Sequence, residues 1–365
     1  NQNVAIGGDS MKANTTGANN TAVGFEALKT NTTTSQNTAI GMYSLKVNIA
    51  ANNTGVGYNA LGANTTGTEN VAVGKSAGAA VTTGSYNTAL GASALDVSTT
   101  GASNVAVGNN ALGANTTASN NTAVGTDALL LNTTGASNVA VGQGALDSNT
   151  TASNNVAVGK SALAANTTGA DNVALGATAL DENTTGSANT AVGSTALNSN
   201  TTASNNTAVG YASQAATTTG TDNVSVGSHS LDANTTGNDN TAIGDNALGA
   251  NTTASNNTAV GSSALLVNTT GHSNVAEGAD SLKANTTGAA NVAVGSEALT
   301  ANTTASQNVA VGAAALAANT TGTANIAVGY QALDANTTGN YNVAVGLSGL
   351  GATTTGSGNV GVGHA

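Results

Sequence analysis

Residues 104–108 read Asn-Val-Ala-Val-Gly, and this stretch recurs from one end of the chain to the other. The first copy is residues 3–7, Asn-Val-Ala-Ile-Gly, and the last is residues 359–363, Asn-Val-Gly-Val-Gly. The closing glycine returns every 17 residues, apart from one step of 16 residues between Gly41 and Gly57, which gives 22 copies in 365 residues. A period of this length marks a repeat array, so the chain is interpreted first as one structural unit used many times.

The residues before the closing glycine predict a short β-strand. We call this glycine position 0 of each repeat. Position −3 is Val, Ile or Thr, position −2 is Ala, Ser or Gly, and position −1 is Val, Ile or Leu in every copy except at Glu277. β-Branched residues suit a pleated strand, and glycine then permits a tight corner or a positive φ.

The rest of the repeat favours a β-solenoid. Ala-Leu stands at positions +3 and +4, as in Ala111-Leu112, Asn stands at +7 in most copies, and Thr-Thr follows it. Seventeen residues are too few for two helices and a turn, and Thr-Thr-Gly would break a continuous helix. We therefore expect an all-β, parallel solenoid of about 22 coils over residues 1–365. Each coil would hold two or three short strands and stack about 4.8 Å from the next. No copy of the repeat differs enough to mark an internal boundary, so we expect a single repeat array that is a segment of a longer fibre.

Stacking places identical residues above one another, which predicts ladders. We expect the columns of Val107 and Leu112 to form the inner core, with Gly108 at a corner. The columns of Asn104 and Asn115 are interpreted as structural ladders, bonded along the stack and to the backbone of the corners.

The alanine at position −2 raises the question of oligomerisation. Strands that are apolar on both faces are usually covered on both. If the valines line the coil's own core, the column of Ala72, Ala106 and Ala140 faces outward and would permit close packing against another chain. The alternative is that alanine is merely a small outward residue on a narrow coil.

Composition excludes several classes of function. Charged residues are 6% of the chain and the net charge is −11, with six lysines and no arginine, so nucleic acid is not an expected partner. There is no cysteine for a disulfide or a thiolate metal site, and no apolar run long enough for membrane insertion. Disorder is the alternative interpretation of such a composition, but strict periodicity argues against it.

No constellation for catalysis is found, and we expect neither enzyme activity nor a cofactor or metal. His229, His272 and His364 lie in different coils, and no Asp recurs on every turn as calcium-binding repeats require. Glu277 is an anomaly, because a buried, unpaired carboxylate is costly. Either the coil opens there, or Glu277 is protonated or partnered.

Two surface features suggest contacts. Phe25, Tyr58, Tyr211 and Tyr330 directly follow the anchor glycine, so their rings would project at corners, either as simple surface residues or as contacts for a glycan or protein receptor. The Thr-Thr columns raise ice binding as a further hypothesis. Since adjacent strand residues face opposite ways, only one rank of threonines would be exposed.

The unit Asn-x-Ala-Val-Gly-x-x-Ala-Leu-x-x-Asn-Thr-Thr-Gly resembles two groups of proteins over the whole chain. One is the head repeats of YadA-like trimeric autotransporter adhesins, and the other is the longer repeats of phage tail-fibre-like and bacterial surface proteins. The matching residues are, for example, Asn104, Val105, Ala106, Val107, Gly108, Ala111 and Leu112. The adhesin repeat is about three residues shorter. The resemblance implies a left-handed parallel β-roll, three chains side by side, and a role in adhesion or as a fibre shaft.

From these observations we expect a non-enzymatic fibre or adhesin shaft that is extracellular, at a cell surface or on a virion, and that assembles with itself as a homotrimer. The alternatives are a filament formed by end-to-end stacking of coils and an ice-binding solenoid. An enzyme on a β-solenoid, such as a polysaccharide lyase, would need clustered carboxylates or basic residues, and the sequence has none.

Overall fold

The computed structural model describes residues 2–364 and confirms the fold class. The chain is an all-β solenoid with about 17 residues per turn, built from three-residue parallel strands, and no helix occurs in the described residues. Each coil has one strand, which ends directly before the anchor glycine. The prediction of two or three strands per coil is therefore wrong.

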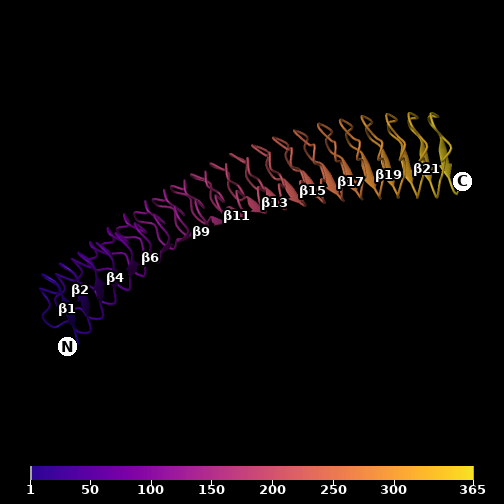
Figure 1. The fold of residues 1–365 in the computed structure, drawn as a ribbon. Helices are drawn as coiled ribbons and strands as arrows, with labels where there is room; N and C mark the ends of the chain where they lie inside the picture. The colour runs from indigo at the N-terminus through magenta and orange to yellow at the C-terminus, as the bar shows by residue number, and fades with distance from the viewer. Residues whose placement is uncertain (1, 365) are drawn as a thin grey trace. The chain divides into compact units, whose positions relative to one another are not determined.

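The chain forms two compact units, Asn1–Thr185 and Gly186–Ala365, and each is a stack of coils (Figure 1). The strands of the first unit are β1 (Val4–Ile6), β2 (Thr21–Val23), β3 (Thr38–Ile40), β4 (Thr54–Val56), β5 (Val71–Val73), β6 (Thr88–Leu90), β7 (Val105–Val107), β8 (Thr122–Val124), β9 (Val139–Val141), β10 (Val156–Val158) and β11 (Val173–Leu175). Those of the second are β12 (Thr190–Val192), β13 (Thr207–Val209), β14 (Val224–Val226), β15 (Thr241–Ile243), β16 (Thr258–Val260), β17 (Val275–Glu277), β18 (Val292–Val294), β19 (Val309–Val311), β20 (Ile326–Val328), β21 (Val343–Val345) and β22 (Val360–Val362).

Within each unit the strands pair in parallel and in register, so each residue lies beside its equivalent in the next coil. In β7 and β8, for example, Ala106 pairs with Ala123 and Val107 with Val124. The main-chain bonds extend beyond the strand, since the Gly108 nitrogen donates to the Leu90 oxygen at 2.8 Å. The main-chain hydrogen bonds therefore repeat with the same period as the sequence.

The rest of the coil, more than four-fifths of its residues, forms no strand because it contains left-handed residues at fixed places. In the coil after β7 these are Asn110 (φ 55°), Leu112 (φ 52°) and Asn120 (φ 62°). The coils still bond to one another there, since the Leu112 nitrogen donates to the Ala128 oxygen at 3.0 Å. Stacking, not strand conformation, satisfies the backbone over this part of the coil.

The anchor glycine is required for two reasons, which Gly108 illustrates. Its φ of 135° lies outside the range that residues with a side chain adopt readily. A Cβ at Gly108 would also lie 2.6 Å from the carbonyl carbon of Gly125 in the next coil. Coils at this spacing have no room for a side chain at position 0.

The core is narrow and is made of alanines, leucines and asparagines. Ala106, Ala111 and Leu112 are fully buried, and so are their equivalents in most coils. Val107 is only half-buried, because the strand directs position −2 inward and positions −3 and −1 outward. The prediction that the Val107 column lines the core is therefore wrong, while Leu112 does lie in the core.

The width of the coil explains why alanine, not valine, faces inward. At Gly55, which replaces alanine in β4, a Cβ would already lie 3.3 Å from the Leu45 Cγ and 2.6 Å from the Ser44 Oγ. Leucine fills the space across from the strand, so position −2 accepts only small side chains, which are Ala or Gly and, at Ser225, Ser.

The single 16-residue step lies in one corner. Asn48 donates to the oxygen of Ala50, two residues on, at 2.7 Å, whereas Asn64 reaches the oxygen of Gly67, three residues on, at 2.9 Å. The lost residue therefore falls between positions +7 and +10. The neighbouring strands β3 and β4 pair in normal register.

Candidate interaction surface

The outward residues of the strands form two columns, at positions −3 and −1, which we call the valine face. Position −1 is aliphatic in every described coil except at Glu277, and position −3 is Val, Ile or Thr. Val71 is 41% exposed, Val158 38% and Val345 39%, so the columns are open to solvent within one chain. Position −1 thus forms an aliphatic strip along all eleven strands of the first unit and, apart from Glu277, along the eleven strands of the second, with Val, Ile or Thr beside it at position −3.

The alanines predicted to contact another chain lie on the opposite side of the strand. Ala72, Ala106 and Ala140 have no solvent exposure and belong to the chain's own core. The prediction that this column faces outward is wrong. A strand that is apolar on both faces is usually covered on both, and here the face left uncovered within one chain is that of the valines.

Glu277 lies at the end of β17, on the valine face, and is exposed. Its neighbours in the column are Val260 and Val294. The coil does not open there, since the register from β16 to β18 is unbroken. A carboxylate at this position meets water in the single chain, so the expected burial penalty does not arise.

The two asparagine columns form ladders inside the stack, and both are buried. The Asn104 Oδ1 accepts from the main-chain nitrogen of Asn121 at 3.0 Å, and its Nδ2 donates to the Ala118 oxygen at 2.9 Å. Asn115 donates to the same Ala118 oxygen at 3.1 Å and accepts from Asn132 at 3.1 Å. Both columns therefore converge on one carbonyl in each coil and fix the corner at position +10.

Where the sequence interrupts the +7 column, the ladder loses a bond. Val81 replaces the asparagine that would follow Asn64, and Thr353 the one that would follow Asn336. The Oδ1 atoms of Asn64 and Asn336 are buried without a hydrogen-bond partner. Each break leaves one orphaned acceptor, in the coil before it.

The Thr-Thr corner presents one free rank of side chains. The first threonine is half-buried, and in Thr116 its hydroxyl donates to the Thr133 main-chain oxygen at 3.1 Å. The second, as in Thr117 and Thr134, is exposed. This matches the single exposed rank that the alternation of side chains predicts, although the pair lies in a bend and not in a strand.

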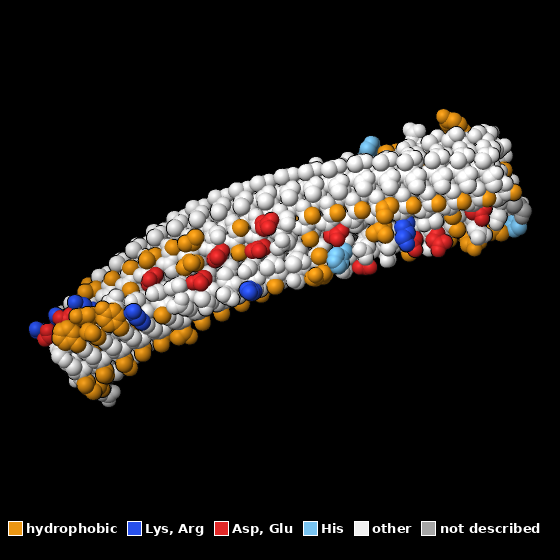
Figure 2. All heavy atoms as spheres, turned by 45° about the horizontal axis from the view of Figure 1, so that its top comes forward, with side chains coloured by type: hydrophobic (Ala, Val, Ile, Leu, Met, Phe, Trp, Pro, Cys, Tyr) orange, Lys and Arg blue, Asp and Glu red, His pale blue; other side chains and the backbone are white. Residues whose placement is uncertain are grey.

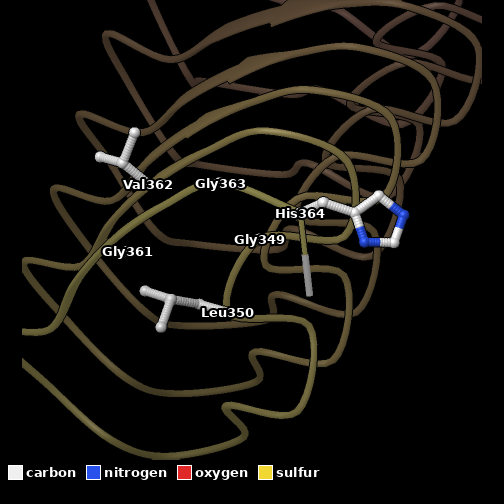
Figure 3. A pocket seen from close by; sticks show the side chains of 6 residues that line it. All are labelled: Gly349, Leu350, Gly361, Val362, Gly363 and His364. Carbon is white, nitrogen blue, oxygen red and sulfur yellow. The ribbon is translucent and has the colours of Figure 1, made fainter.

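A pocket lies at the end of the second unit, lined by Gly349, Leu350, Gly361, Val362, Gly363 and His364 (Figure 3). Leu350 and Gly361 are core positions, and a Cβ at Gly361 would lie 2.7 Å from the Leu350 Cγ. In the preceding coils of this unit the next coil covers the equivalent surface. The pocket is therefore the open end of the core and has no convergent polar groups.

The histidines are not brought together. His229 packs edge-on against Tyr211, with ring centroids 5.3 Å apart, and His272 lies beside Ser273. Within residues 2–364 no three His, Cys, Asp or Glu side chains gather as metal ligands do. The described part of the chain also has no helix of the length and apolar character needed to cross a membrane.

No protein-family model and no curated protein matches this chain.

Proposed function

We propose that this protein is a non-enzymatic fibre shaft that associates with further copies of itself through the valine face. The observation that carries the proposal is the exposed column of aliphatic side chains at position −1, which runs through every strand of the two units except at Glu277. On a surface otherwise composed of Thr, Asn, Ser and Gly, a contiguous apolar strip marks an interface.

The size of the strip fits such an interface. A three-residue strand is about 10 Å long and coils are about 4.8 Å apart, so eleven strands present roughly 500 Å² in each unit. Two units together supply more than the roughly 800 Å² per partner that a stable interface buries.

A second copy of this chain is the best occupant because its spacing matches. A partner that contacts every coil must repeat its own contacts at the same interval along the stack. Another copy does so by construction, with identical columns in register. The resemblance to trimeric adhesin heads favours three parallel chains in a left-handed arrangement, extracellular or virion-attached, with a role in reach and attachment. Coils that contact only their neighbours suit such a role, because length is gained by adding coils.

Sedimentation velocity over a wide concentration range tests this proposal. We expect a discrete trimer for the natural sequence and a monomer for a variant with Val107→Glu, Val141→Glu and Val209→Glu. Glu277 demonstrates that glutamate fits this position in a folded coil. The control is Thr117→Glu with Thr134→Glu, which adds charge away from the valine face and should leave the trimer intact.

A natural sequence that stays monomeric at every concentration would refute self-association, and so would a glutamate variant that remains trimeric. Open-ended polymers whose growth survives the glutamate substitutions would instead support end-to-end stacking of coils.

Ice binding is the second candidate, favoured by the exposed rank at the second threonine. It predicts thermal hysteresis from the natural chain and its loss when Thr117, Thr134 and Thr151 are replaced by lysine. If ice grows in the protein solution as soon as it is cooled below the equilibrium melting temperature, with no hysteresis, the ice-binding hypothesis is wrong.

A further inference from the structure

The first coils carry an aromatic cluster that the repeat does not require. The rings of Phe25, Tyr43 and Tyr58 come from three consecutive coils and form what we call the aromatic ladder. Phe25 and Tyr43 are 5.8 Å apart between ring centroids at 69°, and Tyr43 and Tyr58 are 6.0 Å apart at 67°. Phe25 and Tyr58 are each 47% exposed. Three of the seven aromatic residues of the chain are thus linked at the surface, with Tyr43 in contact with both others.

An ion-pair network lies beside the aromatic ladder. The Lys46 Nζ is 4.7 Å from the centroid of the Tyr43 ring and 2.8 Å from a carboxylate oxygen of Glu26. Lys29 contacts Glu26 at 2.5 Å and Asp9 at 3.8 Å, and Lys12 contacts Asp9 at 3.2 Å. Hydrogen bonds from Lys29 and Lys46 lower the pKa of Glu26. Figure 2 shows hydrophobic side chains gathered beside acidic and basic ones at the N-terminal end.

The fold does not depend on this cluster. The core leucines beneath it, Leu28, Leu45 and Leu61, are as buried as their equivalents elsewhere. The same corner in the coil after β7 carries Asn109 and Asn110 and has the same backbone conformation. Since the coil forms equally well without rings or charges, the cluster is a surface feature added to a completed scaffold.

We propose that the aromatic ladder and its ion pairs bind a neutral oligosaccharide. The C–H face of a pyranose packs on aromatic rings, whose π faces are electronegative. Carboxylates accept hydrogen bonds from sugar hydroxyls, and ammonium groups donate to them. Two carboxylates and three lysines nearly neutralise one another, which suits an uncharged ligand. Phe25 and Tyr58, each half-exposed and in edge-to-face contact with Tyr43 between them, offer two stacking positions along the solenoid, as a chain of sugars requires.

This site is independent of self-association. The aromatic ladder follows the anchor glycine in each coil, at positions +1 and +2, whereas the valine face precedes it at positions −3 and −1. The sequence indicated Phe25 and Tyr58 as corner residues but missed Tyr43, because Tyr43 stands one position later in its coil. Tyr43 could have been included from the sequence, because it lies in the coil between those of Phe25 and Tyr58.

Isothermal titration calorimetry with cellohexaose, mannohexaose and maltohexaose tests the proposal, with chondroitin sulfate as a polyanion for comparison. We expect at least one neutral hexasaccharide to bind, and Phe25→Ser with Tyr58→Ser to weaken binding at least tenfold. Serine occupies position +1 in several other coils, so these substitutions keep the fold, which an unchanged Tm would verify. The control, Tyr330→Ser, removes an isolated ring and should leave affinity unchanged.

Failure of all three neutral probes to bind would overturn the proposal. So would equal affinity in the double variant, or binding of chondroitin sulfate alone, which would indicate a polyanion site on the lysines. The variant with Val107→Glu, Val141→Glu and Val209→Glu should still bind the sugar. Failure of self-association can therefore be distinguished from failure of sugar binding.

Discussion

At the scale of single residues, two positions define the coil most strictly. The anchor glycine sets the distance between coils, and the asparagines at −4 and +7 share one main-chain acceptor, as Asn104 and Asn115 share the Ala118 oxygen. Both features depend on atoms of the neighbouring coil. A substitution at either position is therefore felt in two coils at once.

Gly108→Ala should destabilise the first unit by about 3 kcal/mol, because the new methyl would meet the Gly125 main chain at an unfavourable φ. Gly113→Ala is the matched control. It adds the same methyl where other coils carry Ala, Asp or Lys, and should change stability by less than about 1 kcal/mol. Urea-induced unfolding of both variants would check this, and equal midpoints would contradict the role given to position 0.

The sequence predicted the period, the short strand before the anchor glycine and the asparagine ladders, but it predicted too many strands per coil and assigned the wrong side of the strand to the core. Alternation of Val107 and Ala106 shows that the two residues face opposite ways and does not say which is inside. The decisive information is the width of the coil, which Leu45 and Gly55 reveal only in three dimensions. The sequence did indicate the outward side of the strand. Polar Thr88 stands at position −3 and charged Glu277 at position −1, so these two columns are expected to face solvent.

At the scale of a coil, the structure tolerates defects where they are compensated. In the coil after β13, Gln214 takes the place of the core leucine, and its Nε2 donates to the Ser225 Oγ at 2.9 Å and the Thr207 oxygen at 3.0 Å. Its Oε1 is buried without a partner. This coil is therefore a weak point in the second unit.

Restoring the common residues with Gln214→Leu and Ser225→Ala should stabilise the second unit by about 2 kcal/mol, because a buried unpaired acceptor is removed. Ser213 would then donate to the main chain, as Ser230 does to Ala242 at 2.9 Å. Amide exchange over residues 207–231 should slow. The exposed Gln143→Leu serves as control and should have little effect, and unchanged exchange in the double variant would argue against a weak point.

Three aspartates at position +5, Asp96, Asp181 and Asp232, oppose folding at neutral pH. Burial raises the pKa of Asp96, Asp181 and Asp232, and the charges of Glu182 and Asp147 add to the effect at Asp181. A raised folded-state pKa means that the folded chain holds the proton more tightly than the unfolded chain. The penalty is therefore present above the folded pKa and disappears below the unfolded value of about 3.9.

Asp181→Asn should accordingly stabilise the chain at pH 7 and have no effect near pH 3. Glu26→Gln should do the reverse, with a loss at pH 7 that vanishes in acid, because hydrogen bonding to Lys29 lowers the pKa of Glu26. Thermal unfolding of both variants between pH 3 and pH 7 would check the two signs. Parallel pH profiles for the two variants would contradict them.

At the scale of the whole molecule, Glu277 is the one charged side chain on the valine face, whose other residues are Val, Ile, Leu and Thr. In a single chain this carboxylate is solvated, but in an assembly through the valine face it would be desolvated among aliphatic side chains. The natural sequence thus contains one element that opposes the proposed association.

Glu277→Val should strengthen self-association about tenfold, or 1.4 kcal/mol, because it removes that element. Glu297→Gln removes a carboxylate from the exposed corner at position +2 and should leave association unchanged. Sedimentation equilibrium of the two variants gives the comparison. Weaker association of Glu277→Val would mean that the carboxylate takes part in the contact instead of opposing it.

The hydrogen bonds between side-chain amides of the asparagine ladders run in one direction along each unit. In the first unit Asn104 donates to Asn87 and Asn132 to Asn115, and in the second Asn291 donates to Asn274. Every one of these amides has its N–H side toward the N-terminal neighbour and its carbonyl side toward the C-terminal one. Their dipoles add along the stack, with the positive end at the first coil, in the same sense as the main chain of an α-helix. Here the aligned dipoles belong to side chains, and each added coil extends the two rows of asparagine amides by one residue each.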